Sequence, residues 1–253
     1  MARGQSPPYN GPMTERVPTI LATSGGLIRG RRTDVAFGPL LSYALELSGA
    51  SVPKLLYLGT AMGDDSSSGL RMIEAGKAAG IAVDLLRLFP MPNVDDLRAW
   101  VLSHDLVWVG GGSVANLLAL WRLHGLDAIL TEAWELGVVM AGVSAGSLCW
   151  HIGGTTDSFG PDLSPVTDAM ALLPYSNGVH YDSEPRRRPL FQQLILDGTL
   201  PSGYATEDGT GLLYRGTEMV EAVTEIKGKT AYYVEREGAG VIESALPTRL
   251  LSA

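Results

Sequence analysis

Short apolar runs alternate with longer segments of helical spacing along the first 150 residues. The apolar runs predict strands that are buried on both faces, at Thr19–Thr23, Lys54–Leu58, Ala82–Leu88, Leu106–Val109 and Val138–Val143. The segments between them predict helices, at Phe37–Leu47, Leu70–Ala79, Asp95–Ser103, Val114–His124 and Asp127–Leu136. Strands that alternate with helices in this way indicate βαβ units and a mostly parallel sheet flanked by helices, an α/β fold.

The last third of the chain has a different pattern. Its apolar segments are short and are separated by turns that contain glycine, at Gly211–Tyr214, Met219–Val223, Ala231–Val234 and Gly240–Glu243. This pattern predicts antiparallel hairpins at the edge of the sheet. Because the sequence shows no internal repeat or low-complexity linker, we expect a single α/β domain over residues 18–253. Residues 1–17, which contain three prolines, are expected to form a flexible lead-in.

Composition narrows the possible partners. The net charge of −8 argues against a surface that follows nucleic-acid phosphates, and no apolar run reaches the length of a membrane span. Cys149 is the single cysteine, so no intrachain disulfide can form, which fits a cytoplasmic protein. No two histidines have the spacing of metal ligands on one helix face. We therefore expect no nucleic acid, no membrane, no metal and no cofactor.

The strongest chemical signal is Gly142-Val143-Ser144-Ala145-Gly146, which follows an apolar strand and begins a probable helix. A G-x-S-x-G sequence in that setting is typical of a nucleophile elbow, a sharp turn that exposes the serine hydroxyl. The two glycines would allow close packing around Ser144. The new helix would direct free N–H groups, including that of Ala145, toward an oxyanion. The alternative is a small-residue turn without chemistry.

A second glycine loop, Gly110-Gly111-Gly112-Ser113, also lies between a predicted strand and a predicted helix. Two such loops at strand carboxyl ends can meet in one crevice of an open α/β sheet. The Gly112 amide, paired with that of Ala145, would then form an oxyanion hole. Dinucleotide or phosphate binding is the weaker alternative, because neither of the usual glycine motifs is present.

A serine nucleophile needs a base, and the base needs an orienting acid. His180 is the best candidate base, because it lies in a polar segment and because the elbow helix would carry His151 away from the hydroxyl. His104 and His124 are expected to be solvated at helix ends. The candidate acids are Asp168, Asp182, Glu207 and Asp208. Asp168 would give the chain order Ser, acid, His of the α/β-hydrolases. Glu207 and Asp208 lie in a turn between predicted strands.

Taken together, these motifs resemble the peptidase E (aspartyl dipeptidase) family, which also contains the cyanophycinases. The resemblance extends from about Thr19 to Val234 and rests on the glycine loop, the serine elbow, Asp168-Ala169, His180 and Glu207-Asp208-Gly209. It implies a flavodoxin-like sheet related to class I glutamine amidotransferases.

The resemblance also assigns roles to residues. It implies Ser144 as nucleophile, His180 as base, and Asp208 as the acid where the family has Glu. Gly112 and Ala145 match the oxyanion donors, and Asp168 matches an acidic position near the site. Arg186 aligns best with the arginine that holds the substrate's aspartyl carboxylate. Ser113 replaces a common Asn beside the glycine loop and is also expected to bind substrate.

The expected function is that of a cytoplasmic serine peptidase that hydrolyses short peptides, including dipeptides with N-terminal Asp, through an acyl-enzyme. A cyanophycinase-like exopeptidase or an esterase or amidase with the same triad is one alternative. A non-catalytic binding module with this fold is another. The expected partner is a small peptide substrate, and a homodimer remains open.

Overall fold

The computed structural model describes residues 17–252 of the chain, so the predicted lead-in, apart from Val17, lies outside the described residues. Eight strands form the larger sheet, in the order β16-β13-β12-β1-β7-β6-β4-β5. Their bounds are β1 Thr19–Thr23, β4 Lys54–Leu58, β5 Ala82–Leu86, β6 Leu106–Val109, β7 Val139–Val143, β12 Thr210–Arg215, β13 Glu218–Thr224 and β16 Thr248–Leu250. All five strands that the apolar runs predicted are therefore present.

These five strands form one parallel block, β5-β4-β6-β7-β1. Counted from β4, they have the spatial order 2-1-3-4-5 of a flavodoxin-like sheet, with the first strand of the chain in the fifth position. The order reverses between β4 and β6. The predicted flavodoxin-like fold is thus confirmed, and the carboxyl ends of β4, β6, β7 and β1 share one edge of the sheet.

Helices cover both faces of the parallel block because side chains alternate along each buried strand. In β1, Ile20 and Ala22 pack into the core on one face and Leu21 packs into the core on the other. α1 and α2 contribute to the Leu21 side, and α3, α4, α5 and α6 contribute to the Ile20 side. The helix bounds are α1 Pro39–Leu47, α2 Ser66–Ala79, α3 Leu97–Leu102, α4 Val114–His124, α5 Leu126–Glu135, α6 Ala145–Leu148 and α7 Arg187–Leu196, with a 3₁₀ turn at Thr60–Met62.

One helix begins earlier than the sequence predicted. α2 starts at Ser66, four residues before Leu70, because the Asp65 carboxylate accepts a hydrogen bond from the Ser68 amide at 2.9 Å. This side chain caps the helix start and satisfies an amide that has no partner within the helix.

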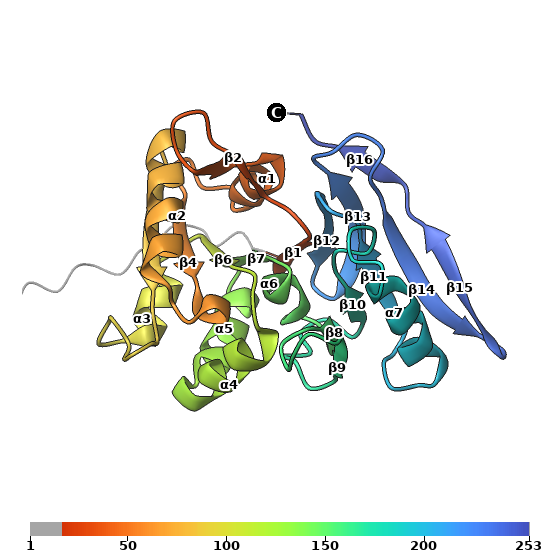
Figure 1. Ribbon diagram of the computed structural model, residues 1–253. Coiled ribbons are helices and arrows are strands. Elements are labelled where there is room, and N and C mark those ends of the chain that lie inside the picture. Colours follow the sequence, from red (N-terminus) through yellow and green to blue (C-terminus); the bar gives the residue numbers. More distant parts are fainter. Residues whose placement is uncertain (1–16, 253) are drawn as a thin grey trace, which may run out of the picture.

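A second sheet, which the sequence did not predict, has the strand order β15-β14-β11-β10-β8-β9. Its strands are β8 Gly153–Thr156, β9 Ser164–Val166, β10 Ser176–Gly178, β11 Gly203–Thr206, β14 Ala231–Glu237 and β15 Gly240–Ala245. Figure 1 shows it with α7 on one side of the molecule, away from α2, α3 and α5. The predicted hairpins exist, but only β12–β13 extends the larger sheet, whereas β14–β15 forms the edge of the second sheet. A further small hairpin pairs β2 Leu27–Arg29 with β3 Val35–Phe37.

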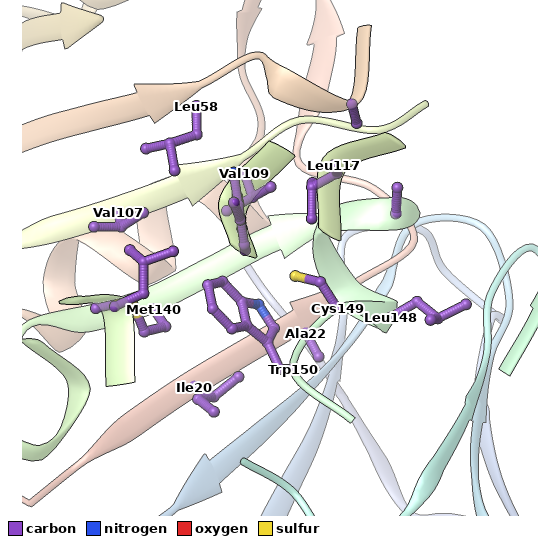
Figure 2. Packing of buried hydrophobic residues seen from close by; sticks show 14 of the residues in the cluster. Ile20, Ala22, Leu58, Val107, Val109, Leu117, Met140, Leu148, Cys149 and Trp150 are labelled. Carbon is purple, nitrogen blue, oxygen red and sulfur yellow. The ribbon is translucent and has the colours of Figure 1, made fainter. Parts of the chain in front are cut away.

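The residues that follow the elbow anchor it in the core. Figure 2 shows Trp150 and Cys149 over the sheet residues Ile20, Ala22, Val109 and Met140. The Trp150 ring also lies 6.0 Å from that of Trp121 on α4. Close packing of this kind holds the start of α6 rigidly against the strands.

Two of the other histidines are buried. His104 was expected to be solvated, but it is only 4% exposed, and its Nδ1 donates to the Trp100 carbonyl at 2.8 Å. That prediction was wrong because α3 ends against β5, where Asp84 lies 3.1 Å from His104 Nε2. His151 is fully buried, as a packing role requires. Its Nδ1 donates to the Ser147 carbonyl at 2.9 Å, and the Tyr214 hydroxyl donates to its Nε2 at 3.2 Å.

Acid should destabilise the fold through His151. Burial lowers the pKa of this imidazole to about 4. Between pH 6.5 and pH 4 the imidazole is therefore protonated in the unfolded chain and neutral in the folded chain. The free energy of unfolding should therefore fall as the pH drops from 6.5 to 4, by up to about 3 kcal/mol. Urea denaturation at pH 7 and pH 4.5 measures this loss. It should be smaller in His151→Gln and unchanged in His124→Gln. An equal loss in all three proteins would contradict this account.

Candidate active site

Ser144 sits in a strained turn between β7 and α6. Its backbone angles are φ 59° and ψ −113°, a left-handed conformation that is rare for a residue with a side chain. The turn is held on both sides, because the Ser144 amide donates to the Thr23 carbonyl at 3.0 Å and its own carbonyl accepts from the Leu148 amide at 2.9 Å. Strain that the surroundings maintain in this way is a common feature of nucleophile elbows.

The two glycines of the motif are required by close backbone contacts. A Cβ on Gly142 would lie 2.5 Å from the Gly146 carbonyl oxygen, and one on Gly146 would lie 2.2 Å from that of Val109. These distances are below van der Waals contact, and the obstructing atoms belong to the backbone. The end of β6 therefore lies directly against the elbow.

The second glycine loop meets the elbow, as the sequence predicted for two loops at one sheet edge. A Cβ on Gly111 would lie 3.2 Å from Ser144 Cβ and 3.8 Å from Ser144 Oγ. Gly112 has φ 130°, and its backbone packs against the Ala61 carbonyl. Within residues 17–252, the amides of Gly111 and Gly112 have no hydrogen-bond acceptor. Ser113 caps α4 by accepting from the Asn116 amide at 3.2 Å.

His180 and Asp208 form a pair. His180 follows β10, Asp208 lies in the turn between β11 and β12, and Asp208 Oδ1 is 2.6 Å from His180 Nδ1. The imidazole is 23% exposed and the carboxylate 39%, so the pair borders solvent. A carboxylate on Nδ1 fixes the ring orientation and leaves Nε2 as the proton acceptor.

Consecutive residues at the end of β1 hold the nucleophile candidate and the base candidate. Thr23 accepts from the Ser144 amide through its carbonyl, and the Ser24 hydroxyl accepts from the His180 amide at 3.1 Å. The Ser24 hydroxyl also shares a 2.7 Å hydrogen bond with that of Thr206 on β11. The two sheets are therefore joined where the candidate residues lie. In the described part of the chain the Ser144 hydroxyl has no hydrogen-bond partner, so it is free to face a substrate.

The other candidate acids are engaged elsewhere. Glu207 accepts from the Thr230 amide and the Tyr232 hydroxyl, both at 3.0 Å. Asp168 is exposed and pairs with Arg122 at 3.0 Å. Asp182 accepts from the Asp208 amide at 2.9 Å and forms an ion pair with Lys229. Partial burial opposes the ionisation of Asp182, but these two donors hold its pKa below the usual value.

Arg186 lies just before α7 with its side chain 66% exposed. The guanidinium pairs with Asp162 at 2.7 Å and donates to the Pro161 carbonyl at 2.7 Å. The neighbouring Arg187 is buried and supports the second sheet by donating to the Thr155 carbonyl at 2.7 Å. Arg186 and Arg187 are therefore neighbours in sequence with different environments, one exposed and one buried.

Several residues near the candidate site were not singled out from the sequence. Ser24 and Glu225 line a cavity of about 420 Å³ together with Val143, His180 and Asp208. The sequence could have pointed to Ser24, because it lies between a predicted strand and Gly25-Gly26. Ser113 and Ser144 likewise lie next to glycines at the end of a strand. Glu225 had none, because its position depends on how β13 folds back.

Other chemistry at this site finds little support. Cys149 is fully buried, and burial raises the pKa of its thiol well above the usual value, which suits packing and disfavours nucleophilic attack. Between residues 17 and 252, no three His, Cys, Asp or Glu side chains gather as metal ligands would. Over the same residues, no helix is long and apolar enough to cross a membrane.

Comparison with known proteins identifies the family of this chain. The family model described as peptidase family S51 matches residues 20–222. The chain is 39% identical to "Uncharacterized peptidase YgaJ" of Bacillus subtilis (strain 168) over 209 residues, which cover 83% of this chain and 90% of that protein. It is 27% identical to "Peptidase E" of Shewanella denitrificans over 173 residues, 64% of this chain and 70% of the relative.

Two solved structures share the fold. One is a peptidase from an acI-B1 Actinobacterium, with a TM-score of 0.64 and 16% identity, covering 92% of this chain and 96% of that one. The other is a putative peptidase E protein from Listeria monocytogenes EGD-e, with a TM-score of 0.56 and 16% identity, covering 91% and 100%. The extent of the family match and the 39% identity over most of both sequences show that the chain belongs to peptidase family S51.

Proposed function

We propose that this peptidase is of the serine type and hydrolyses short peptides, with Ser144 as nucleophile, His180 as base and Asp208 as the orienting acid. The observation that carries the proposal is the 2.6 Å pair of His180 and Asp208 beside the strained Ser144 turn, with Thr23 and Ser24 holding the two sides together. A nucleophile, a base and an orienting carboxylate, brought together where the two sheets meet, are the components that acyl transfer needs.

The reaction proceeds through an acyl-enzyme. His180 Nε2 takes the Ser144 proton as Oγ attacks the scissile carbonyl carbon, and the carbonyl π bond opens to an oxyanion. The oxyanion then collapses, the C–N bond breaks, and His180 donates the proton to the leaving amine. Water, deprotonated by His180, next attacks the ester carbonyl. The acyl C–Oγ bond then breaks, His180 returns the proton to Ser144 Oγ, and the carboxylic acid product leaves. The Ser144–His180 hydrogen bond forms when substrate binds, because such bonds commonly tighten only in the complex.

Backbone amides stabilise the oxyanion. Ala145 is the first residue of α6, where amides lack intrahelical partners and the helix dipole is positive. Gly112 supplies the second amide from the loop that adjoins Ser144. Each such donor contributes on the order of 2.7–4 kcal/mol to transition-state stabilisation in other serine hydrolases.

An assay of three substrate classes tests the proposed reaction. We expect turnover of dipeptides with N-terminal Asp, the substrate that the resemblance to the aspartyl dipeptidases implies. β-Asp-Arg and a p-nitrophenyl ester serve as the other two classes. Preferred turnover of β-Asp-Arg would favour the cyanophycinase-like alternative, and turnover of the ester alone would favour an esterase. No turnover of any class by folded protein would favour a binding module and contradict the proposal.

Arg186 is proposed to bind the substrate's aspartyl carboxylate. Its ion pair with Asp162 is solvent-exposed and therefore weak, so a substrate carboxylate can displace it and form a bidentate contact. Arg186→Ala should raise KM for Asp-containing dipeptides by about tenfold or more and leave neutral dipeptides within about twofold. Steady-state kinetics on both substrates measures the ratio. An equal rise for both would exclude Arg186 as a carboxylate contact.

A further inference from the structure

Four arginines gather in a hollow separate from the cavity that contains His180. Arg29, Arg31, Arg32 and Arg71 line a hollow of about 580 Å³ formed by the β2–β3 hairpin and α2, and within residues 17–252 Asp34 is the one acidic residue that lines it with them. In the described part of the chain, Arg29, Arg31 and Arg32 have no acidic partner. A concentration of unpaired guanidinium groups is unusual in a protein with a net charge of −8. It creates a local positive potential that attracts carboxylates.

This hollow adjoins a smaller cavity that lies beside the elbow. Arg71 and Val35 line both spaces, and the smaller one, of about 210 Å³, is also bounded by Gly110, Gly111 and Val143. Gly111 is the residue that lies against Ser144. A chain bound with its scissile carbonyl at Ser144 can therefore pass through the smaller cavity toward the arginines.

The smaller cavity suits an aliphatic stem that ends in a charged head. Its walls include Leu27, Met72 and Trp108, and Arg71 lines both this cavity and the arginine hollow. The Arg71 guanidinium is held by a 3.0 Å hydrogen bond to Ser68 Oγ. The Tyr57 hydroxyl approaches the glycine loop, at 2.7 Å from where a Cβ on Gly110 would lie. Together they present donors to an anionic group above an apolar wall.

The two sides of the candidate site differ in charge. The cavity with His180 also contains the carboxylates of Asp208 and Glu225, and Glu225 accepts from the Gly26 amide at 2.9 Å. The cavity lined by Gly111 contains the cation Arg71 and, among the described residues, no acidic one. A peptide with acidic residues is attracted to the arginine side and repelled from the other, which gives it one orientation in the site.

We propose that the arginine hollow is an extended subsite for acidic peptides, in which Arg71 binds the first carboxylate beyond the scissile bond and Arg29, Arg31 and Arg32 bind those that follow. The preferred substrates are then peptides longer than a dipeptide that carry at least two carboxylates on this side. This inference rests on the proposed function only in placing the scissile bond at Ser144.

Binding to the Ser144→Ala protein tests the inference without turnover. Isothermal titration calorimetry compares Asp-Leu-Glu-Glu with Asp-Leu-Gln-Gln, which has the same length and nearly the same shape. We expect the Glu peptide to bind about tenfold or more tightly, with an advantage that shrinks as salt rises. Arg71→Ala and the double variant Arg31→Ala/Arg32→Ala, each made in the Ser144→Ala protein, should each reduce that advantage at least threefold, whereas Arg236→Ala should not.

Three results would overturn the inference. Equal affinity for the two peptides would remove the carboxylate preference, and an unchanged preference in both arginine variants would place it elsewhere. Competition by inorganic phosphate as effective as that by the Glu peptide, at equal ionic strength, would show only a general anion site. Labelling of each arginine variant by a fluorophosphonate, with Ser144 restored, tests the nucleophile separately. Failure of the subsite is therefore distinguishable from failure of the proposed reaction.

Discussion

Ser144→Ala is expected to abolish peptide hydrolysis, with a loss of about a millionfold in kcat, the scale found when other serine hydrolases lose their nucleophile. The reason is that no other hydroxyl occupies the strained turn, and the one nearby thiol, Cys149, is buried. Steady-state kinetics on the best dipeptide measures the loss.

The matched control is Ser103→Ala, an exposed serine at the end of α3 far along the chain from the elbow. It should keep full activity, and both variants should keep the parent's thermal midpoint within about 2 °C, because neither removes a large buried group. Ser144→Ala protein that still turns over substrate at more than about a thousandth of the parent rate would contradict the assigned role.

The second large effect is expected at the acid. Asp208→Asn should lower kcat about ten-thousandfold, because an amide oxygen cannot hold the His180 tautomer as a carboxylate does. The neighbouring Glu207→Gln is the matched comparison. Its carboxylate is bound to Thr230 and Tyr232 at the base of the turn and does not touch the imidazole, so kcat should fall less than about tenfold.

These two variants separate adjacent carboxyl groups that the sequence could not. Kinetics must be accompanied by denaturation curves, because Glu207→Gln weakens two hydrogen bonds and can lower stability. A larger loss of kcat in Glu207→Gln than in Asp208→Asn, with both proteins folded, would show that Glu207 and not Asp208 is the acid that orients His180.

Much of the parallel sheet was predictable because buried strands are marked by local apolar runs. β1 and β6 have the predicted bounds, and α4 begins at Val114 and ends at His124, as its pattern indicated. The elbow was also visible, because G-x-S-x-G is a motif of consecutive residues, even though the backbone of Val109 on β6 is what requires glycine at positions 142 and 146. Strands, helices and motifs that are marked by consecutive residues can therefore be predicted from the sequence.

The second sheet could not be predicted for the opposite reason. β8 and β10 are short and rich in small or polar residues, and their glycines are explained by partners distant in sequence. A Cβ on Gly154, for example, would lie 2.0 Å from the carbonyl oxygen of Asn177. Neither the spacing of apolar residues nor the composition of these segments indicates such contacts. The positions of Ser24 and Glu225 also depend on contacts between residues distant in sequence.

The arginine hollow could not be predicted either, because it too depends on contacts between residues distant in sequence. Arg29, Arg31 and Arg32 are close in sequence, but Arg71 joins them only because α2 packs beside the β2–β3 hairpin. No spacing in the chain relates Arg71 to Gly111. The choice among candidate acids is similar, since Asp208 meets His180 only because β10 and β11 are parallel neighbours in the second sheet, which the sequence did not predict.

Reaction with a fluorophosphonate probe tests the central claim most directly. The account predicts one covalent adduct per chain, mapped by peptide mass spectrometry to Ser144, and a rate of labelling that falls sharply in His180→Ala and in Asp208→Asn. Folded protein that acquires no adduct, or an adduct on a residue other than Ser144, would contradict the account.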